Sequence, residues 1–211
     1  MLTVKSIALP SVSMPLTSIS SRPPLRIPPG RFASVESSMF YCEVEGDSIK
    51  VKSITKGCRN DYERICAIYK WICDNIQYDT SYEIYDADRC YKNKKGVCSA
   101  YCNLFYYMAK AAGVRTVIVN GSAKGFGGIG GHVWIFAYIN KKQGILLDPT
   151  WGAGGVGGIG GTTFYKSKDC WEWFNVDPKS LIKTHFPEDE SYQFLEKPVT
   201  LEEFTENNYT N

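Results

Sequence analysis

The sequence has no long apolar run, no excess of charge of one sign, and only two histidines. No apolar run approaches the roughly 18 to 20 residues that a membrane helix needs, so we expect a soluble protein with no membrane span. The net charge is only +2, and no basic patch supplies the electrostatic footprint of a nucleic-acid-binding protein. With two histidines and no C-x-x-C pair, a structural zinc site has little to draw on. We therefore expect neither metal nor cofactor, and no nucleic-acid partner.

Cysteine is present, but its pattern argues against a disulfide framework. The eight cysteines are an even number, which would permit disulfides in an oxidising compartment. However, Cys66 with Cys73, and Cys98 with Cys102, stand at helical intervals in segments typical of buried helix faces, where free cysteine behaves as a small hydrophobe. We expect reduced thiols and a cytoplasmic protein. The alternative is secretion, since Lys5 precedes a short apolar stretch, although prolines interrupt it and make a poor signal peptide.

Length and proline distribution indicate one domain behind an N-terminal arm. A chain of 211 residues with 44% hydrophobic composition suits a single domain. Six of the ten prolines lie within residues 1–29, mixed with serine, so residues 1–32 are predicted to form an extended or disordered arm. Residues 33–211 form the predicted domain, with its core at about 60–155. Segments 32–44 and 48–54 resemble a pair of strands leading into it.

Hydrophobic periodicity predicts helices first and a sheet afterwards. Isoleucines recur at three- and four-residue steps within 60–76, which predicts an amphipathic helix. A second helix is predicted over 97–113, with Gly113 as its C-terminal cap. Strands are expected at 114–121, 132–139 and 145–148, the last two joined as a hairpin. This order is typical of the α+β class.

Two glycine runs, at 125–131 and 152–157, match the spacing G-x-G-x-x-G of nucleotide-binding loops. Such a loop must open a helix, because the helix N-terminus holds the phosphate. Each run here is followed by a β-prone segment instead. We therefore interpret them as mobile loops that flank a cleft, one approaching His132 and the other leaving Asp148.

Three residues stand where thiol chemistry requires them. Cys98 begins a predicted helix, whose N-terminus favours the thiolate and whose first N–H groups can stabilise an oxyanion. His132 begins one strand of the hairpin and can move protons near neutral pH. Asp148 ends the partner strand, so the hairpin should place it beside His132 to fix the imidazole tautomer. His185 precedes Pro187 by two residues and is expected to make a capping or loop contact instead.

The segments KGVCSAYCNLFYYMAKAAGV, GHVWIFAYI and LLDPTW resemble the core of the transglutaminase-like superfamily, in the family's order. Residues 173–195 further resemble the C-terminal stretch of bacterial proteins related to the kyphoscoliosis peptidase group. The resemblance implies a papain-like, transglutaminase-core fold, with the nucleophile helix packed on an antiparallel β-sheet. It also implies that Cys98 is the nucleophile, His132 the general base and acid, and Asp148 the residue that orients it.

The resemblance leaves the remaining site residues open. Gln77 and Trp71 are the nearest upstream donors for the oxyanion. Trp151 and Gly131 are candidate substrate contacts, because they flank the predicted aspartate and histidine. No calcium-binding acidic cluster is visible in the sequence.

The function expected is that of a cysteine-dependent hydrolase or acyl transferase. It would act on amide bonds of protein or peptide substrates through a thioester. Hydrolysis is favoured over crosslinking, because nothing in the sequence identifies a site that excludes water and binds an amine. The alternative is a non-catalytic transglutaminase-like module that binds a protein or glycan. Substrate identity and oligomeric state stay open.

Overall fold

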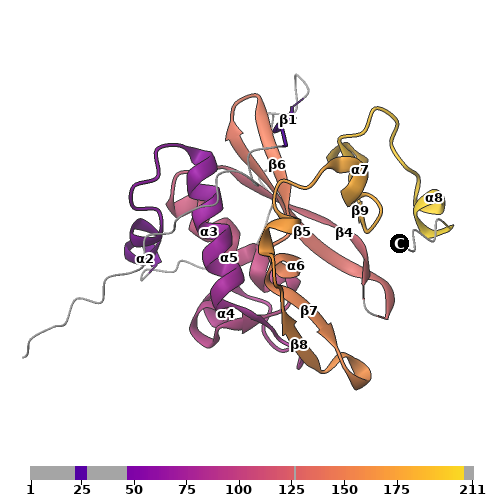
Figure 1. The fold of residues 1–211 in the computed structure, drawn as a ribbon, viewed down its shortest axis with the longest axis horizontal. Helices are drawn as coiled ribbons and strands as arrows, with labels where there is room; N and C mark the ends of the chain where they lie inside the picture. The colour runs from indigo at the N-terminus through magenta and orange to yellow at the C-terminus, as the bar shows by residue number, and fades with distance from the viewer. Residues whose placement is uncertain (1–21, 28–46, 126, 207–211) are drawn as a thin grey trace, which may run out of the picture.

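An antiparallel sheet with packed layers on both faces organises the molecule (Figure 1). The structure, a computed structural model, describes residues 22–27, 47–125 and 127–206. Its five-stranded sheet has the order β1-β6-β5-β4-β9, and every neighbouring pair is antiparallel. The strands are β1 Leu25–Arg26, β4 Thr116–Gly125, β5 Gly128–Asn140, β6 Gln143–Leu147 and β9 His185–Pro187. The predicted α+β order and the hairpin of β5 and β6 are confirmed.

Two long helices form the layer on one face of this sheet. Helix α3, Asp61–Asn75, starts at Asn60, whose side chain accepts the backbone N–H of Glu63. Helix α5, Cys98–Ala111, is followed by Gly113 at a φ of +76°, a conformation that glycine adopts without strain. Both helices were predicted from their periodicity, and together with Ile135 and Ala137 of β5 they enclose the larger core cluster.

The predicted strand at 48–54 is wrong, because α2, Asp47–Ile54, is a helix. The alternation of apolar and polar residues resembles a strand pattern, but Val51 and Ile54 are one helical turn apart and both pack against the helical core. Burial on α3 and α5 therefore overrides the local pattern. The partner strand predicted at 32–44 lies outside the described residues.

The second face of the sheet is covered by the C-terminal part of the chain (Figure 1). Trp134 and Phe136 of β5 point to this face, opposite to Ile135, because side chains alternate along a strand. Leu181 of α7, Pro178–Leu181, packs there, and Phe194 stacks on Phe136 with ring centroids 4.8 Å apart. Strand β9 then extends the sheet beyond β4. The chain after β6 thus returns to build the far side of the site.

The remaining elements of the described chain are short. They are β2 Gln77–Tyr78, α4 Ala87–Asn93, β3 Lys95–Gly96, α6 Pro149–Ala153, β7 Gly154–Gly157, η1 Ile159–Gly161, β8 Thr163–Lys166, η2 Cys170–Trp173, η3 Glu190–Gln193 and α8 Leu201–Glu206. Strands β7 and β8 pair as a separate hairpin, and β2 and β3 pair in parallel. As predicted, neither glycine run opens an α-helix.

Part of the predicted N-terminal arm is described, and it lies extended along the sheet. Leu25 and Arg26 pair with Gly144 and Gln143 of β6. The Asn175 side chain donates a hydrogen bond to the Arg22 carbonyl at 2.9 Å. The other residues of the arm lie outside the described ranges. Within those ranges no helix has the length and apolar character that crossing a membrane requires.

Candidate active site

Cys98 is the first residue of α5 and is half-buried. Val97 precedes it as the N-cap in extended conformation, and the Val97 side chain offers no acceptor to the first N–H groups of the helix. Gly96 allows β3 to pass close to the first turn of α5, because a Cβ atom at this position would lie only 2.6 Å from the Cβ of Ala100. The sequence Gly-Val-Cys thus turns the chain abruptly from a strand into a helix whose positive end carries the thiol.

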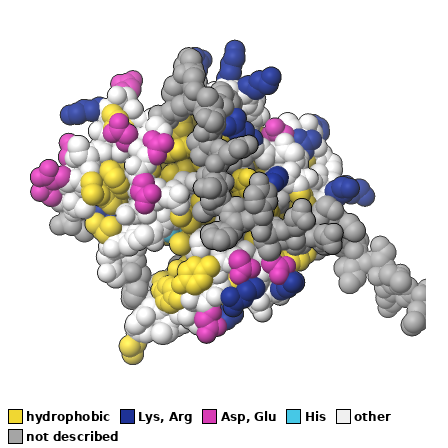
Figure 2. Space-filling view, turned by 180° about the vertical axis from the view of Figure 1, so that it is seen from behind, with side chains coloured by type: hydrophobic (Ala, Val, Ile, Leu, Met, Phe, Trp, Pro, Cys, Tyr) yellow, Lys and Arg dark blue, Asp and Glu magenta, His cyan; other side chains and the backbone are white. Residues whose placement is uncertain are grey.

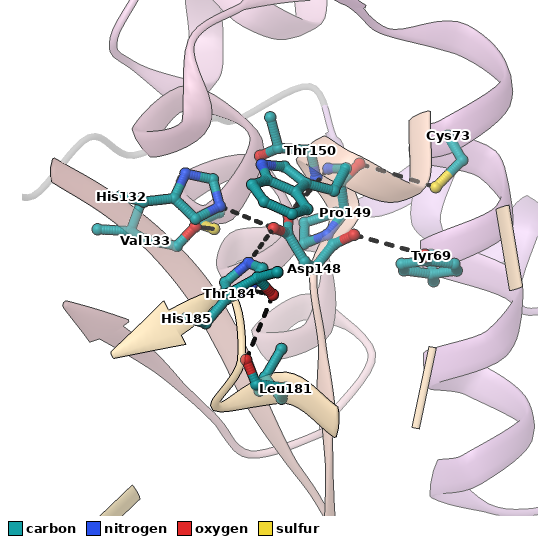
Figure 3. Close-up of polar contacts among 12 residues, drawn as sticks. Tyr69, Cys73, His132, Val133, Asp148, Pro149, Thr150, Leu181, Thr184 and His185 are labelled. Atoms are coloured by element: carbon teal, nitrogen blue, oxygen red, sulfur yellow. Dashed lines mark hydrogen bonds and ion pairs between the residues drawn. The ribbon is translucent and has the colours of Figure 1, made fainter. Parts of the chain in front are cut away.

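His132 and Asp148 lie together, as the hairpin predicted (Figure 3). His132 is on β5, opposite Gly121 of β4, and Asp148 follows the last residue of β6. The His132 Nε2 and Asp148 Oδ2 atoms are 2.7 Å apart. Both side chains are buried. Because Nε2 faces the carboxylate, Nδ1 is the nitrogen left to face another group.

Asp148 is held in place by its own backbone neighbours. It is the N-cap of α6, and its Oδ1 accepts the N–H groups of Thr150 at 2.7 Å and Trp151 at 3.1 Å. The Tyr69 hydroxyl of α3 donates to the Cys170 carbonyl at 2.5 Å and also lies 3.4 Å from the Asp148 carbonyl, and the Cys73 thiol faces the Pro149 carbonyl (Figure 3). The backbone at Asp148 is therefore held against the helical layer, while the N–H groups of α6 fix the carboxylate.

The electrostatics of the pair follow from this arrangement. Burial lowers the pKa of His132, but the Asp148 carboxylate and then Cys98, through a hydrogen bond and its charge, outweigh burial and raise the pKa to about 10. Burial raises the pKa of Asp148, yet His132 and His185 hold it well below its usual range. Cys98 is thus one of the groups that raise the pKa of His132, the imidazole that bonds Asp148.

His185 is the residue that sequence reasoning misjudged. The expected loop contact is wrong, because His185 is buried in β9 and its Nε2 lies 3.0 Å from Asp148 Oδ2 (Figure 3). Strand β9 pairs His185 with Ala123 of β4, a long-range pairing that no local pattern announces. Burial lowers the pKa of His185, although Asp148 opposes this effect. The feature of the sequence that could have drawn attention to His185 is that the chain has only two histidines.

A cleft of about 690 Å³ opens beside His132. Both glycine runs line it, the first at Gly125 and 127–131 and the second at Gly154 and Gly155. The two runs flank a cleft at the histidine as predicted, but the expected loops are wrong, because most of the first run lies in β5 and most of the second in β7, where strand pairing orders them. Tyr78, Tyr82 and Trp173 add aromatic walls. The segment 78–90, which is rich in tyrosine and aspartate, therefore contributes to the cleft through Tyr78 and Tyr82.

The four remaining candidates lie in different places. Trp151 and Gly131 both line the cleft, and the Trp151 ring lies 5.7 Å from that of His132. Trp71 stacks on Tyr91 with ring centroids 5.7 Å apart, and Gln77 is exposed on β2. Neither Trp71 nor Gln77 is among the residues that line the cleft.

Tyr78 is a site residue that sequence reasoning did not single out. It lines the cleft, and burial followed by the charge of Cys98 raises the pKa of its hydroxyl. The hydroxyl therefore stays protonated close to the thiol. Asp79 shapes the adjoining loop by accepting the N–H groups of Glu83 and Ile84, each at 2.9 Å. The feature of the sequence that could have indicated Tyr78 is its position directly after Gln77, a candidate oxyanion donor.

His132, Asp148 and His185 also form a group whose ligand atoms lie within 4.8 Å of one another, close enough to hold a metal ion. Both imidazoles direct Nε2 at the same Asp148 oxygen, at 2.7 Å and 3.0 Å, which are hydrogen-bond distances. To bind a metal there, each imidazole would have to give up the proton that it now donates. The geometry fits a hydrogen-bonded cluster better than a ligand set.

Comparison with known proteins identifies the family of the chain. Residues 50–149 match the family model of the transglutaminase-like superfamily. Kyphoscoliosis peptidase of Homo sapiens is 31% identical over 174 residues, which are 75% of this chain and 26% of that protein. Lim and transglutaminase domain protein ltd-1 of Caenorhabditis elegans is 24% identical over 225 residues, or 87% of this chain and 30% of that protein. The chain thus spans about a quarter to a third of the length of these relatives.

Among solved structures, a protein from Cytophaga hutchinsonii assigned as a cysteine protease is 22% identical, with a TM-score of 0.47 over 52% of this chain and 38% of that one. A crystal structure of a TGase is 14% identical, with a TM-score of 0.39 over 49% of this chain and 29% of that one. The family match confirms the papain-like, transglutaminase-core fold inferred from the sequence.

Proposed function

The chain belongs to the transglutaminase-like superfamily, and from this premise we propose that it is a cysteine-dependent enzyme acting on amide bonds of proteins or peptides. The observation that carries the proposal is the pair of contacts made by one imidazole. His132 bonds Asp148 at 2.7 Å and interacts with the thiol at the start of α5. A thiol, a base and a group that orients the base are the parts that nucleophilic acyl transfer needs.

In the proposed reaction, the Cys98 thiolate attacks the carbonyl carbon of the amide. The C–N bond then breaks, and protonated His132 gives its proton to the leaving amine, which leaves a thioester on Cys98. A water molecule, deprotonated by His132, attacks the thioester and releases the acid, and the thiolate is restored. Asp148 keeps the imidazole in the tautomer that presents Nδ1 to the thiol and stabilises the imidazolium.

For the oxyanion of the tetrahedral intermediate, the backbone N–H of Cys98 and the Tyr78 hydroxyl are the donors that we propose. The Cys98 N–H belongs to the uncapped end of α5, and the Tyr78 hydroxyl stays protonated beside the thiol. Trp71 and Gln77 are less suited to this role, because the Trp71 ring stacks on Tyr91 and Gln77 is exposed on β2.

The edge of β5 provides a surface for an extended peptide. The Tyr138 N–H bonds the Arg115 carbonyl of the neighbouring chain segment at 3.0 Å, so even-numbered residues of β5 direct their backbone groups at β4. The backbone groups of odd-numbered residues point away from β4, toward the side of β5 where β6 pairs only as far as Ile135. The backbone of Ile129 and Gly131 is therefore directed toward the cleft. We propose that the substrate main chain bonds there, with Trp151 as an aromatic contact.

Hydrolysis fits this site better than crosslinking. Gly128 to Gly131 are exposed along the cleft, so water reaches the thioester. Among the described residues that line the cleft, the cationic side chains are Lys124 and protonated His132, and no carboxylate lines it to hold an incoming amine. Crosslinking would need such a subsite.

An active ester tests the chemistry without knowledge of the substrate. Wild type treated with p-nitrophenyl acetate should carry one acetyl group, on Cys98, and release it to water faster than to added cadaverine. Cys98→Ala should lose the acetyl group, and Cys58→Ala, which removes another half-buried thiol, should keep it. Intact-protein and peptide mass spectrometry locate the label. Acetyl groups spread over several thiols, with no preference for Cys98, would contradict the enzyme and favour the non-catalytic binding module.

A further inference from the structure

Asp148 accepts hydrogen bonds at all of its lone-pair positions. Backbone N–H groups of α6 occupy Oδ1, and two imidazoles share Oδ2, His132 at 2.7 Å and His185 at 3.0 Å (Figure 3). A carboxylate offers about four such positions. The reaction proposed above uses only one of these bonds, the one to His132. The bond to His185 therefore needs its own explanation.

The surroundings of His185 fix which of its nitrogens carries a proton. Its Nδ1 lies 2.8 Å from the hydroxyl of Thr184, which can donate to it. The same hydroxyl lies 3.3 Å from the Leu181 carbonyl, the alternative acceptor for its single proton. Since Asp148 can only accept at Oδ2, Nε2 must be the donor, and neutral His185 then has Nδ1 free to accept from Thr184. The Nε2–H tautomer satisfies both contacts.

Tryptophan rings enclose His185 and keep it away from substrate. The ring centroids of Trp151, Trp134 and Trp173 lie 4.5 Å, 5.1 Å and 5.3 Å from that of His185. Only 1% of the residue is exposed. The ionisable side chains that face it are Asp148, from the end of β6, and His132, from β5, whose ring lies 5.2 Å away. His185 therefore acts only through Asp148.

We propose that His185 is a positioning residue of the candidate active site, and that its Nε2–H holds the Asp148 carboxylate ionised and aimed at His132. The bond to His185 prevents Oδ2 from turning away from His132, while the neutral ring adds no charge that would compete for the carboxylate. The site would then work as a relay from Thr184 through His185, Asp148 and His132 to Cys98. This inference rests on the proposed function, since it assigns His185 a role in the same chemistry.

The bond can be observed directly in the wild-type protein. With imidazole ¹⁵N labelling, the chain gives signals from only two histidines, and ¹⁵N shifts distinguish the two tautomers. Near pH 7, His185 should be neutral with its proton on Nε2. A neutral His185 with its proton on Nδ1, or a charged ring, would overturn the proposal without any variant.

Paired variants separate positioning from packing. His185→Gln keeps an N–H close to the place of Nε2 and loses the ring, whereas His185→Phe keeps a ring among the tryptophans and loses the donor. We expect alkylation of Cys98 by iodoacetamide at pH 7 to fall about tenfold or more in His185→Phe and to stay within about threefold of wild type in His185→Gln, the scale of outer-shell effects. The reverse order, or equal rates in all three proteins, would overturn the proposal.

Thr184 supplies a second pair that leaves the imidazole in place. Thr184→Val removes the hydroxyl that donates to Nδ1, and Thr184→Ser retains it. Because Asp148 fixes the Nε2–H tautomer, we expect that tautomer to persist in both variants, with a changed Nδ1 ¹⁵N shift and slower Cys98 alkylation in Thr184→Val alone. An unchanged Nδ1 shift and an unchanged rate in Thr184→Val would count against the relay. If wild-type Cys98 reacts like an ordinary thiol while His185 shows the expected tautomer, the proposed function fails and the hydrogen-bond assignment stands.

Discussion

At the scale of single residues, Asp148 and the two histidines behave as one unit. Asp148 is fully buried, and a buried carboxylate is tolerated only when its charge is compensated and its oxygens are hydrogen-bonded. Two backbone N–H groups and two imidazoles meet this need. The consequence is that the pKa values of the two histidines, although neighbours, are driven in opposite directions.

The stability of the fold should depend on pH through His132. Its folded pKa, about 10, lies above the unfolded value of about 6.5, so between these values the folded state binds more protons than the unfolded chain. The stabilisation is complete below about pH 6.5 and is lost as pH rises toward 10. Urea unfolding across this range should show the decline in wild type and a smaller one in His132→Gln. A flat wild-type profile would contradict the raised pKa.

His185 should show the opposite linkage on the acid side. Because burial lowers the pKa of His185 in the folded state, the unfolded chain binds a proton at a pH where folded His185 is still neutral. The free energy of unfolding therefore falls as pH drops below about 6.5. NMR titration of the two imidazoles should place the midpoint of His132 above this value and that of His185 below it. Coincident midpoints would refute the opposed shifts.

Removing the charge of Asp148 should be costly to the fold. In Asp148→Asn, Oδ1 still caps α6, but an amide N–H would face the two imidazole donors. We expect the free energy of unfolding to fall by about 2 to 4 kcal/mol. The matched control is Asp169→Asn, an exposed cap whose side chain accepts the Trp171 N–H, which should cost less than about 1 kcal/mol. Equal losses in urea denaturation would argue against a special role of the buried charge.

At the scale of elements, the site forms where β6 ends and β5 continues. Strand β6 stops at Leu147, so the edge of β5 from Ile129 to Val133 has no strand beside it among the described residues. Cys98 begins α5 in the helical layer and contributes to the raised pKa of His132, while β9 is placed by its pairing with β4. An interrupted strand thus brings groups from both layers to one carboxylate.

The start of α5 should be sensitive to its glycine. A Cβ on Gly96 would lie 2.6 Å from Ala100 Cβ and 3.1 Å from the Cys90 sulfur, so Gly96→Ala must displace the first turn of α5. We expect a loss of about 1 to 3 kcal/mol, as for overpacked cores, together with slower alkylation of Cys98. Gly130→Ala is the control, because a methyl group at that position would meet nothing within 4 Å. Equal melting temperatures of the Gly96→Ala and Gly130→Ala variants would contradict the close packing at Gly96.

The open edge of β5 should select extended chains. Gly131→Pro removes the N–H that faces the cleft, a change that edge strands accept, while Gly131→Ala keeps the N–H and adds a methyl group with nothing within 4 Å. With unfolded, fluorescein-labelled casein as substrate, the KM should rise about fivefold or more for the proline variant only, the value of roughly one hydrogen bond. Equal KM values for the two variants would exclude main-chain recognition at this position.

At the scale of the whole molecule, the layers on the two faces of the sheet contribute different residues to the candidate active site. The helical face carries the larger core and the nucleophile, and the C-terminal segment covers the other face and supplies His185. Acidic and basic side chains both occur on the face drawn in Figure 2, and little histidine is visible there. That view agrees with the small net charge and with the burial of both histidines.

The parts predicted from the sequence are those that local patterns determine. The helical period of 60–76, the glycine after α5 and the short polar turn of the hairpin each act within a few residues, and the hairpin alone places His132 beside Asp148. Long-range packing decided the rest. Helix α2 owes its form to α3 and α5, and His185 owes its place to the pairing of β9 with β4.

Activation of Cys98 by His132 can be tested by measuring the alkylation of each cysteine as a function of pH. Wild type and His132→Ala would be treated with iodoacetamide and the labelled peptides followed by mass spectrometry. Cys98 should react fastest of the thiols below about pH 8 in wild type and lose that advantage without His132. If Cys98 instead reacts like the other thiols in both proteins, no thiolate–imidazolium pair exists and the proposed enzyme is ruled out.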